Sequence, residues 1–450
     1  MSSDKADDRN PGSAPARQIT TFDKPAPVAV TERITSIDTL RGFALLGILV
    51  INIDVFALPG VVFFAPQLAG GFTGLNLATW SFGSMFFLNK MMAIFSMLFG
   101  AGLVLMYERF EARGQKFGRI HYRRIFWLLV IALIHGYLLW YGDILFAYSI
   151  CAFLLFLFRR RSARFLIWSA VAVLCFGMIL QAGTGGLFYY LRGEAAASRE
   201  RLAQGEEIAE FRQGIIKSWD EIQANFNPSP EKITGEINAY RGGFSDVFNE
   251  RARATFEMQT SSMIYFIFWR AAGLILLGMG LMKLGVFSGK RKKNFYTRLI
   301  IFGYGLGLPM TALATYESIQ TNFDIILQFA GIGQLNYIGS ILVALGHVGL
   351  IITLFRSGVL SGLAKRLAAV GRMALTNYLM HSIICTTLFY GYGFGLFNRI
   401  ERIGLLGIVV LVWIFQLIIS PIWLKKYRFG PAEWLWRTLT YWRKQPMKIA

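Results

Sequence analysis

Long apolar runs recur along this chain of 450 residues, and they constrain its fold more than any other feature. About ten runs approach the roughly 20 residues that a helix needs to cross a bilayer. They lie at 37–58, 81–106, 123–141, 143–158, 163–190, 262–287, 295–315, 335–355, 370–395 and 403–424. Hydrophobic residues make up 55% of the chain, which is more than a soluble surface can cover. The sequence therefore predicts an all-α, polytopic membrane helix bundle with about ten transmembrane helices.

The distribution of Lys and Arg predicts how these runs are oriented. A net charge of +20 would by itself suit a nucleic-acid-binding protein. The cations instead gather in alternate segments, at 107–124, 159–164, 290–293, 365–372 and after 424, whereas 59–80 and 316–334 contain none. By the positive-inside rule, this alternation predicts a multi-pass membrane protein with both termini in the cytoplasm. No nucleic-acid partner is expected.

The composition divides the chain into five segments. Residues 1–32 are rich in Pro and mixed charges and predict a disordered cytoplasmic tail, and 33–190 hold the first five spans. The polar segment 191–261 predicts an external cap of amphipathic helices, broken near 227–230, although a solvated spacer fits equally well. Residues 262–424 hold the other five spans. The basic, aromatic tail 425–450 is typical of a cytoplasmic anchor to lipid headgroups.

The first apolar run carries three polar residues on one stripe. At about 100° per residue, Asp38, Arg41 and Asn52 share one helix face. Asp38 and Arg41 can pair at a spacing of three residues, and Asn52 lies towards the outer end. The stripe has two interpretations that the residues leave open, an ion pair that fixes helix packing or a functional site.

Other polar residues interrupt the later runs. Lys90 can extend to the outer headgroups or serve a function. His135 lies in the outer half of its run, with Asp143 just beyond the end, so the two suit a base and the carboxylate that orients it. His347 and His381 lie at mid-depth, where packing is the simpler interpretation.

Arg270 begins an apolar stretch that weakly echoes the one after Arg41, and a five-plus-five inverted repeat would explain this echo. The three cysteines share no short spacing, so neither a metal site nor a disulfide is predicted. The sequence also lacks a Walker A motif, GxSxG and HExxH, which gives ATP hydrolysis and metal chemistry no support.

Five ordered motifs resemble those of the bacterial YeiB-like membrane family, which has long been labelled a domain of unknown function. They are SIDTLRG, NKMMAIFSMLFGAG, ALIHGYLLWYGDIL, GRMALTNYLMHS and FGPAEWLWRTLTY, and they span roughly 32–442. This family is similar to the transmembrane acyltransferase superfamily, which includes heparan-alpha-glucosaminide N-acetyltransferase. The positions that match the first helix of that enzyme are Ser36, Asp38, Thr39, Arg41, Gly42 and Asn52. Its active histidine follows the first helix, whereas 59–80 contains no His here.

The resemblance implies a protein of the bacterial inner membrane that transfers an acyl group from cytoplasmic acyl-CoA to a hydroxyl or amine at the outer face. We expect His135 and Asp143 to be catalytic, and Arg41 with Asp38 to bind the CoA donor. The expected substrate-binding residues are Asn52, Lys90, Arg270 and His381. Expected partners are membrane lipids, a small-molecule or glycan acceptor, and a second copy of the chain. The alternatives are a secondary transporter or lipid-handling protein, and a scaffold whose external cap binds a partner.

Overall fold

The structure is a computed structural model that describes residues 34–449. The tail predicted at 1–32 lies outside the described residues. Those described form helices, with a single isolated bridge between Tyr427 and Lys448. The first half contains α1 (Thr35–Ala57), α2 (Gly74–Phe86), α3 (Lys90–Ala112), α4 (Gly118–Leu138), α5 (Leu145–Leu155), α6 (Ala163–Ala203), α7 (Glu210–Phe226), α8 (Pro230–Arg241) and α9 (Phe244–Glu257). A π-helical segment, Met258–Ile267, joins α9 to α10 (Phe268–Lys283).

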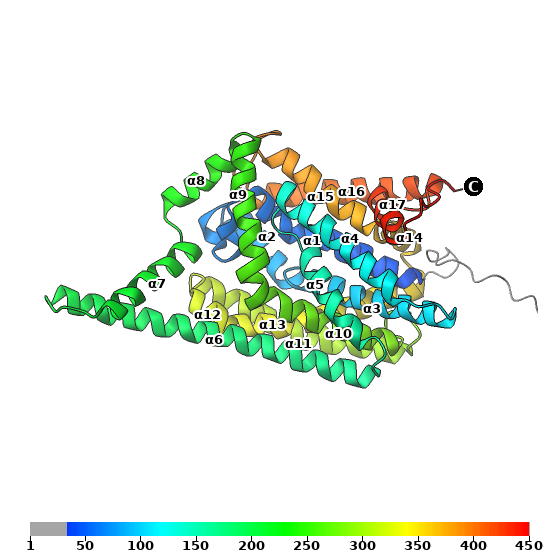
Figure 1. Cartoon of the computed structure of the whole chain (residues 1–450), viewed down its shortest axis with the longest axis horizontal. Helices are drawn as coiled ribbons and strands as arrows, with labels where there is room; N and C mark the ends of the chain where they lie inside the picture. Colours follow the sequence, from blue (N-terminus) through cyan, green and yellow to red (C-terminus); the bar gives the residue numbers. More distant parts are fainter. Residues whose placement is uncertain (1–33, 450) are drawn as a thin grey trace, which may run out of the picture. The chain divides into compact units, whose positions relative to one another are not determined.

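The second half continues with α11 (Lys293–Gln320), α12 (Ile325–Ala330), α13 (Ile332–Ser357), α14 (Ser361–Arg372), α15 (Ala374–Phe389), α16 (Arg402–Lys426) and α17 (Pro431–Tyr441). In Figure 1, α6 runs along one side of the bundle, and α7, α8 and α9 lead back in sequence from its far end to α10. The all-α prediction is confirmed.

Seven described helices, rather than about ten, are long and apolar enough to cross a membrane. They are Thr35–Ala57, Gly74–Ala112, Ala163–Ala203, Phe244–Lys283, Lys293–Gln320, Ile332–Ser357 and Arg402–Lys426. The predicted runs 123–141, 143–158 and 370–395 do not qualify. Arginines enter the first turns of α4, whereas α5 has 11 residues and α15 has 16. The sequence predicts more spans than these seven helices because the apolar runs 143–158 and 370–395 extend beyond α5 and α15, and because arginines occupy the start of α4.

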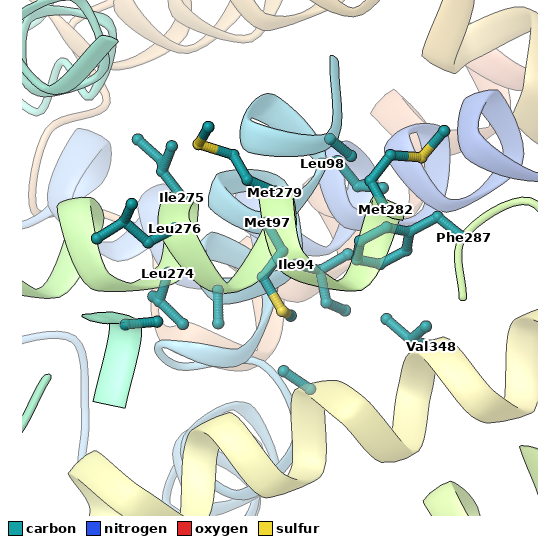
Figure 2. Packing of buried hydrophobic residues seen from close by; sticks show 14 of the residues in the cluster. Ile94, Met97, Leu98, Leu274, Ile275, Leu276, Met279, Met282, Phe287 and Val348 are labelled. Atoms are coloured by element: carbon teal, nitrogen blue, oxygen red, sulfur yellow. The ribbon is translucent and has the colours of Figure 1, made fainter. Parts of the chain in front are cut away.

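Glycines bring the two central helices of the bundle into backbone contact. A Cβ placed on Gly100 of α3 would lie 2.1 Å from the carbonyl oxygen of Ile275, and one on Gly278 of α10 would lie 1.9 Å from that of Met97. Figure 2 shows the apolar side chains around this crossing, with Val348 of α13 beside them. Small residues allow such close approach, so van der Waals packing holds the pair together.

A second glycine crossing joins α1 to α14. A Cβ on Gly371 would lie 1.9 Å from the carbonyl oxygen of Asp38, and one on Gly42 would lie 2.0 Å from that of Leu367. The start of α1 is therefore fixed against the end of α14. This contact places the first-run residues Asp38 and Arg41 beside a helix more than 300 residues away in sequence.

The polar segment 191–261 forms helices that contact the bundle. Helix α6 continues through the predicted boundary at 190 to Ala203, and Ile215 and Trp219 of α7 are buried against α6 and α12. The backbone N–H of Gly391 donates to the carbonyl oxygen of Tyr240, 2.8 Å away. The segment is therefore helical and contacts the bundle at two places along its length.

Helix α17, inside the predicted basic tail, closes over the start of α15. Glu433 Oε1 accepts hydrogen bonds from the backbone N–H groups of Leu375, at 2.6 Å, and Thr376, at 3.2 Å. The Thr376 hydroxyl donates to the second carboxylate oxygen at 2.5 Å. Because the first N–H groups of a helix have no intrahelical acceptor, Glu433 supplies a cap from a distant element. The motif FGPAEW thus fixes α15.

Candidate functional site

The start of α1 carries the predicted ion pair. An Arg41 Nη1–H donates to Asp38 Oδ1 across 3.0 Å. The neighbouring Ser36 hydroxyl donates to the carbonyl oxygen of Phe287 at 2.7 Å. The Arg41 side chain keeps 28% of its surface exposed, against 11% for Asp38. The guanidinium is therefore accessible while its partner is largely enclosed.

Arginines from three other helices surround this pair. The charges of Arg41 and Arg437 act on Arg124, and Asp38 acts on Arg372 and Arg437. The Arg124 guanidinium stacks 4.3 Å from the ring centre of Trp436 in α17. We call Arg41, Arg124, Arg372 and Arg437 the arginine cluster. Two carboxylates, Asp38 and Glu433, act on the guanidinium groups of this cluster, so its four arginines leave surplus positive charge. Among residues 34–449, the buried Nε of Arg372 has no hydrogen-bond acceptor.

The opposite end of α1 is held by a different ion pair. Arg402 Nε donates to Asp54 Oδ2 across 3.0 Å, and its Nη2 donates to the carbonyl oxygen of Pro66 at 2.8 Å. The Arg402 side chain is only 1% exposed, so this pair clamps the helix end. Asn52 is half-buried and takes part in none of the side-chain hydrogen bonds seen among residues 34–449. The predicted stripe on α1 is therefore not a continuous network.

His135 and Asp143 meet, as predicted, and Ser382 joins them. Asp143 Oδ2 lies 2.7 Å from His135 Nδ1, and His135 Nε2 lies 2.7 Å from the Ser382 hydroxyl. With an ionised carboxylate on one side, Nδ1 must carry the proton, so Nε2 accepts from Ser382. We call Asp143, His135 and Ser382 the relay. All three residues are buried.

Local structure explains how the relay is assembled. Helix α4 ends three residues after His135, and the short turn to α5 brings Asp143 back beside it. Asp143 Oδ1 also accepts from the backbone N–H of Phe146 at 2.8 Å, which fixes the carboxylate at the start of α5. Ser382 comes from α15, 247 residues further along the chain. The FGPAEW cap on α15 therefore bears directly on the position of Ser382.

Helix α9 covers the end of α4 beside the relay. The Thr255 hydroxyl donates to the carbonyl oxygen of Gly136 at 2.9 Å, and Arg251 Nε donates to that of Tyr137 at 2.9 Å. These bonds satisfy carbonyls that a helix end leaves without partners. The π-helical segment begins immediately afterwards, and π-helices are often found at functional sites.

His381 belongs to a separate network, although it adjoins Ser382 in sequence. His381 Nε2 lies 3.0 Å from Gln416 Oε1, and Gln416 Nε2 donates to the carbonyl oxygen of Asn377 at 3.0 Å. Successive helical residues point about 100° apart, so His381 faces α16 while Ser382 faces α4. This arrangement favours the packing interpretation of His381.

Lys90 and Arg270 converge on α13. Lys90 Nζ donates to the carbonyl oxygen of Ser84 at 2.7 Å and to Asn336 Oδ1 at 3.2 Å. Arg270 donates from Nη2 to the Ser340 hydroxyl at 2.7 Å. Lys90 is 0% exposed, so it does not extend to the headgroups as one interpretation held. We call Lys90 and Arg270, with their neutral acceptors, the cation centre.

The remaining histidines make hydrogen bonds within the packing. His347 Nδ1 lies 2.7 Å from the Tyr304 hydroxyl, and His121 Nε2 lies 3.0 Å from the carbonyl oxygen of Ala152. Within the described part of the chain, no three His, Cys, Asp or Glu side chains are grouped so that they could hold a metal ion.

Ser382 is the site residue that sequence reasoning missed. It lies next to the considered His381 in TNYLMHS, but a serine in an apolar run is common and gives no signal of its own. From the sequence, Arg124, Arg372 and Arg437 belong to three separate basic segments, and nothing in it assigns them to one site. Their common location depends on the packing of α4, α14 and α17 on α1.

Comparison with known proteins gives relatives that match over nearly the full length of the chain. The family described as "Protein of unknown function (DUF418)" matches residues 281–443. The chain is similar to "Uncharacterized protein YeiB" of Escherichia coli K12, with 30% identity over 422 residues, covering 91% of this chain and 96% of the relative. It is also similar to "Uncharacterized protein YxaH" of Bacillus subtilis 168, with 28% identity over 440 residues, covering 94% and 97%.

Proposed function

The chain belongs to the DUF418 family of YeiB-like bacterial proteins, and we propose that it is a membrane acyltransferase. The proposed reaction moves an acyl group from cytoplasmic acyl-CoA to a hydroxyl or amine at the outer face of the inner membrane. The observation that carries this proposal is the relay, in which the carboxylate of Asp143 orients His135 towards a hydroxyl. The resemblance of SIDTLRG to the transmembrane acyltransferase superfamily supports it independently.

In this reaction His135 acts as a general base. Its Nε2 removes the proton from the acceptor hydroxyl or amine as the acceptor attacks the thioester carbonyl. The C–S bond then breaks, and the same proton passes from His135 to the departing thiolate of CoA. Asp143 stabilises the imidazolium that exists between these two transfers.

The arginine cluster suits the phosphates of the donor. CoA carries several phosphate charges, and Arg41 offers a partly exposed guanidinium within a cluster that has more cations than carboxylates. We expect Arg41→Lys to weaken acyl-CoA binding, because Lys supplies a point charge without the guanidinium fork. Isothermal titration of the folded variant measures the change, with Arg443→Lys in the exposed tail as the control. Equal affinity of parent and Arg41→Lys would remove Arg41 from the donor site.

The proposal includes an orientation. We propose that α4, α5 and α15 also cross the membrane, which brings the crossings to about ten and places both termini in the cytoplasm. Arginine-rich α4 then begins on the cytoplasmic side, and α7 and α8 lie outside. Cysteine introduced at position 225 should react with an impermeant reagent in intact cells, whereas cysteine at 291 should not. The reverse labelling pattern would contradict the orientation.

The direct test of function is transfer of radiolabelled acetyl or longer acyl groups from CoA to a membrane extract by the purified protein. We expect His135→Gln to lower the rate about 10²- to 10⁴-fold while the protein remains folded, because Gln cannot act as a base. His381→Gln is the matched control, since His381 lies one residue from Ser382 but faces α16. Acyl transfer by His135→Gln at the parent rate would refute the role of His135 as the general base.

A secondary transporter is the second candidate, and the cation centre favours it. Lys90 and Arg270 lie buried between apolar helices, and such cations frequently mark pathways for anions. Uptake of a labelled organic anion into proteoliposomes, lost in Lys90→Met, would favour transport. Acyl transfer without uptake would favour the enzyme.

A further inference from the structure

We propose that Ser382 carries the acyl group as a covalent ester between donor and acceptor. This inference rests on the proposed function but goes beyond it, since His135 could also activate the acceptor directly. The hydroxyl of Ser382 lies 2.7 Å from His135 Nε2, and His135 is held by Asp143. A nucleophile beside a base that is itself oriented by a third group is the arrangement that activates serine.

The hydrogen bond of Ser382 differs from those of Ser149 and Ser318, two other buried helical serines. Ser149 donates to the carbonyl oxygen of Leu145 at 2.8 Å, and Ser318 donates to that of Ala314 at 2.7 Å. Both bonds join a residue to the fourth one before it, which is how a helical serine is normally satisfied. Ser382 makes no such bond to Tyr378 and contacts His135 instead. Its hydroxyl is therefore engaged with the base rather than with its own helix.

Two buried donors beside the relay lack acceptors. Among residues 34–449, the Trp140 Nε1–H and a Gln259 Nε2–H have no hydrogen-bond partner, and Trp140 is 2% exposed. The Trp140 ring lies 6.5 Å from that of His135 between ring centres. Gln259 Nε2 lies 3.2 Å from the Cβ position of Gly136, next to His135. Because a buried donor without an acceptor is costly, these groups point to a ligand oxygen that they would bind.

The oxygen that fits is the carbonyl oxygen of the acyl group. When Ser382 attacks, this oxygen gains negative charge, and donors placed in advance stabilise that charge. Gln259 belongs to the π-helical segment, where one extra residue per turn changes the direction of a side chain. Helix α9 thus covers the end of α4 beside the relay, and the π-helical segment that follows α9 provides a donor.

The covalent steps balance as follows. Ser382 Oγ forms a bond to the thioester carbon while its proton moves to His135 Nε2, and the C–S bond then breaks as this proton moves to the sulfur of CoA. An acceptor hydroxyl or amine next gives its proton to His135 and attacks the ester carbon. The ester C–O bond breaks, and the proton returns to Ser382. The products are CoA thiol and the acylated acceptor.

Exchange of CoA tests this intermediate without knowledge of the acceptor. A covalent intermediate allows the purified full chain to exchange radiolabelled CoA into unlabelled acetyl-CoA, or into a longer acyl-CoA, when no acceptor is present. We expect exchange in the parent and a loss on the order of 10³-fold or more in Ser382→Ala. Ser149→Ala is the matched control, because Ser149 is a buried serine bonded only to its own helix.

A second measurement identifies the acylated atom. Mass spectrometry of protein quenched with acyl-CoA should place the acyl group on the peptide that contains Ser382, as an ester stable to neutral hydroxylamine. In Ser382→Cys the adduct should become a thioester, which neutral hydroxylamine cleaves. Recovery of a labile adduct in this variant also shows that the site remains folded.

The outcomes separate the two proposals. Exchange that depends on Ser382, with the adduct on this residue, supports the covalent step. The covalent step is overturned if the parent transfers acyl groups to a membrane extract without CoA exchange and Ser382→Ala does so at the parent rate. This result leaves the acyltransferase proposal in place. If the folded parent shows neither CoA exchange nor acyl transfer with any acyl-CoA, both proposals are overturned.

Discussion

The relay and the cation centre are both buried in the bundle, but they differ in how charge is balanced. In the relay, Asp143 carries a charge that His135 can offset on taking up a proton, and both ring nitrogens have partners. In the cation centre, Lys90 donates to neutral oxygens, and the charge of Arg270 acts on it. Like charges at short range in an apolar medium repel.

This difference teaches what each centre is suited to do. The relay can move a proton between two positions without leaving an unpaired charge in the bundle, which is the requirement for acid–base chemistry. The cation centre connects α3, α10 and α13 through fixed donors, so it suits helix packing or the binding of an anion. Three substitutions test this comparison.

The largest effect is expected from Asp143→Asn. The Asn side chain can still accept from Phe146 at the start of α5, so the fold should be kept. Its amide N–H groups, however, would face His135 Nδ1 and drive the proton to Nε2, which removes the base. We expect acyl transfer to fall about 10²- to 10⁴-fold, measured with the radiolabelled donor.

Asp324→Asn is the matched control for this change, because Asp324 also accepts backbone N–H groups at a helix start but has no histidine partner. If Asp143→Asn transfers acyl groups at the parent rate, the relay does not carry out the acid–base chemistry that distinguishes it from the cation centre.

An intermediate effect is expected from Glu433→Ala, which removes the cap on α15, the helix that carries Ser382 of the relay. The change leaves the N–H groups of Leu375 and Thr376 and the Thr376 hydroxyl without their acceptor. We expect a loss of about 2–3 kcal/mol in the free energy of unfolding, since buried donors would be unsatisfied. Thermal unfolding in detergent measures this loss. Glu433→Gln keeps an acceptor and is the control, and equal destabilisation by both variants would contradict the capping role.

The same residue gives a pH dependence of stability. Burial raises the pKa of Glu433, although the hydrogen bonds from Thr376 oppose this shift. The folded protein therefore keeps this proton at pH values where the unfolded chain has lost it. Its contribution to stability is present below the ordinary carboxyl pKa and is lost as pH rises through the raised value. Glu433→Gln should flatten that part of the curve of Tm against pH.

The smallest effect is expected from Lys90→Met. Met keeps most of the side-chain volume and removes a buried charge, so lost hydrogen bonds and avoided desolvation should nearly cancel. We expect the free energy of unfolding to change by no more than about 1 kcal/mol and acyl transfer to stay near the parent rate. Lys90→Ala, which leaves a cavity, should be clearly less stable. A large loss of transfer in Lys90→Met would show that the cation centre belongs to the catalytic site.

Part of the site could be predicted because it is local. His135 and Asp143 are eight residues apart across a short turn, so a helix end and a glycine already indicate that they meet. The Asp38–Arg41 pair likewise follows from a spacing of three residues on one helix. In both cases, backbone geometry limits the distance between the two side chains whatever the rest of the chain does.

The number of membrane spans could not be predicted from local sequence in this way. Hydropathy marks apolar residues, but α5 and α15 are short and α4 begins among arginines. Where such helices begin and end depends on neighbours, as with the cap that Glu433 supplies to α15. A hydropathy window along the sequence therefore predicts a longer span than the helix that forms, because tertiary contacts set where the helix ends.

By itself, the sequence determined that this is a helical, multi-pass membrane protein of the YeiB-like family, because apolar composition and motif order are properties of the chain alone. It also determined the pairs that lie within one or two helical turns. Only the tertiary structure decided that Ser382 completes the relay, that Lys90 and Arg270 share a centre, and that Arg124, Arg372 and Arg437 join Arg41 and Asp38 in one cluster. These residues are far apart along the chain, and their meeting depends on backbone contacts such as Gly42 with Leu367 and Gly100 with Ile275, which no local pattern encodes.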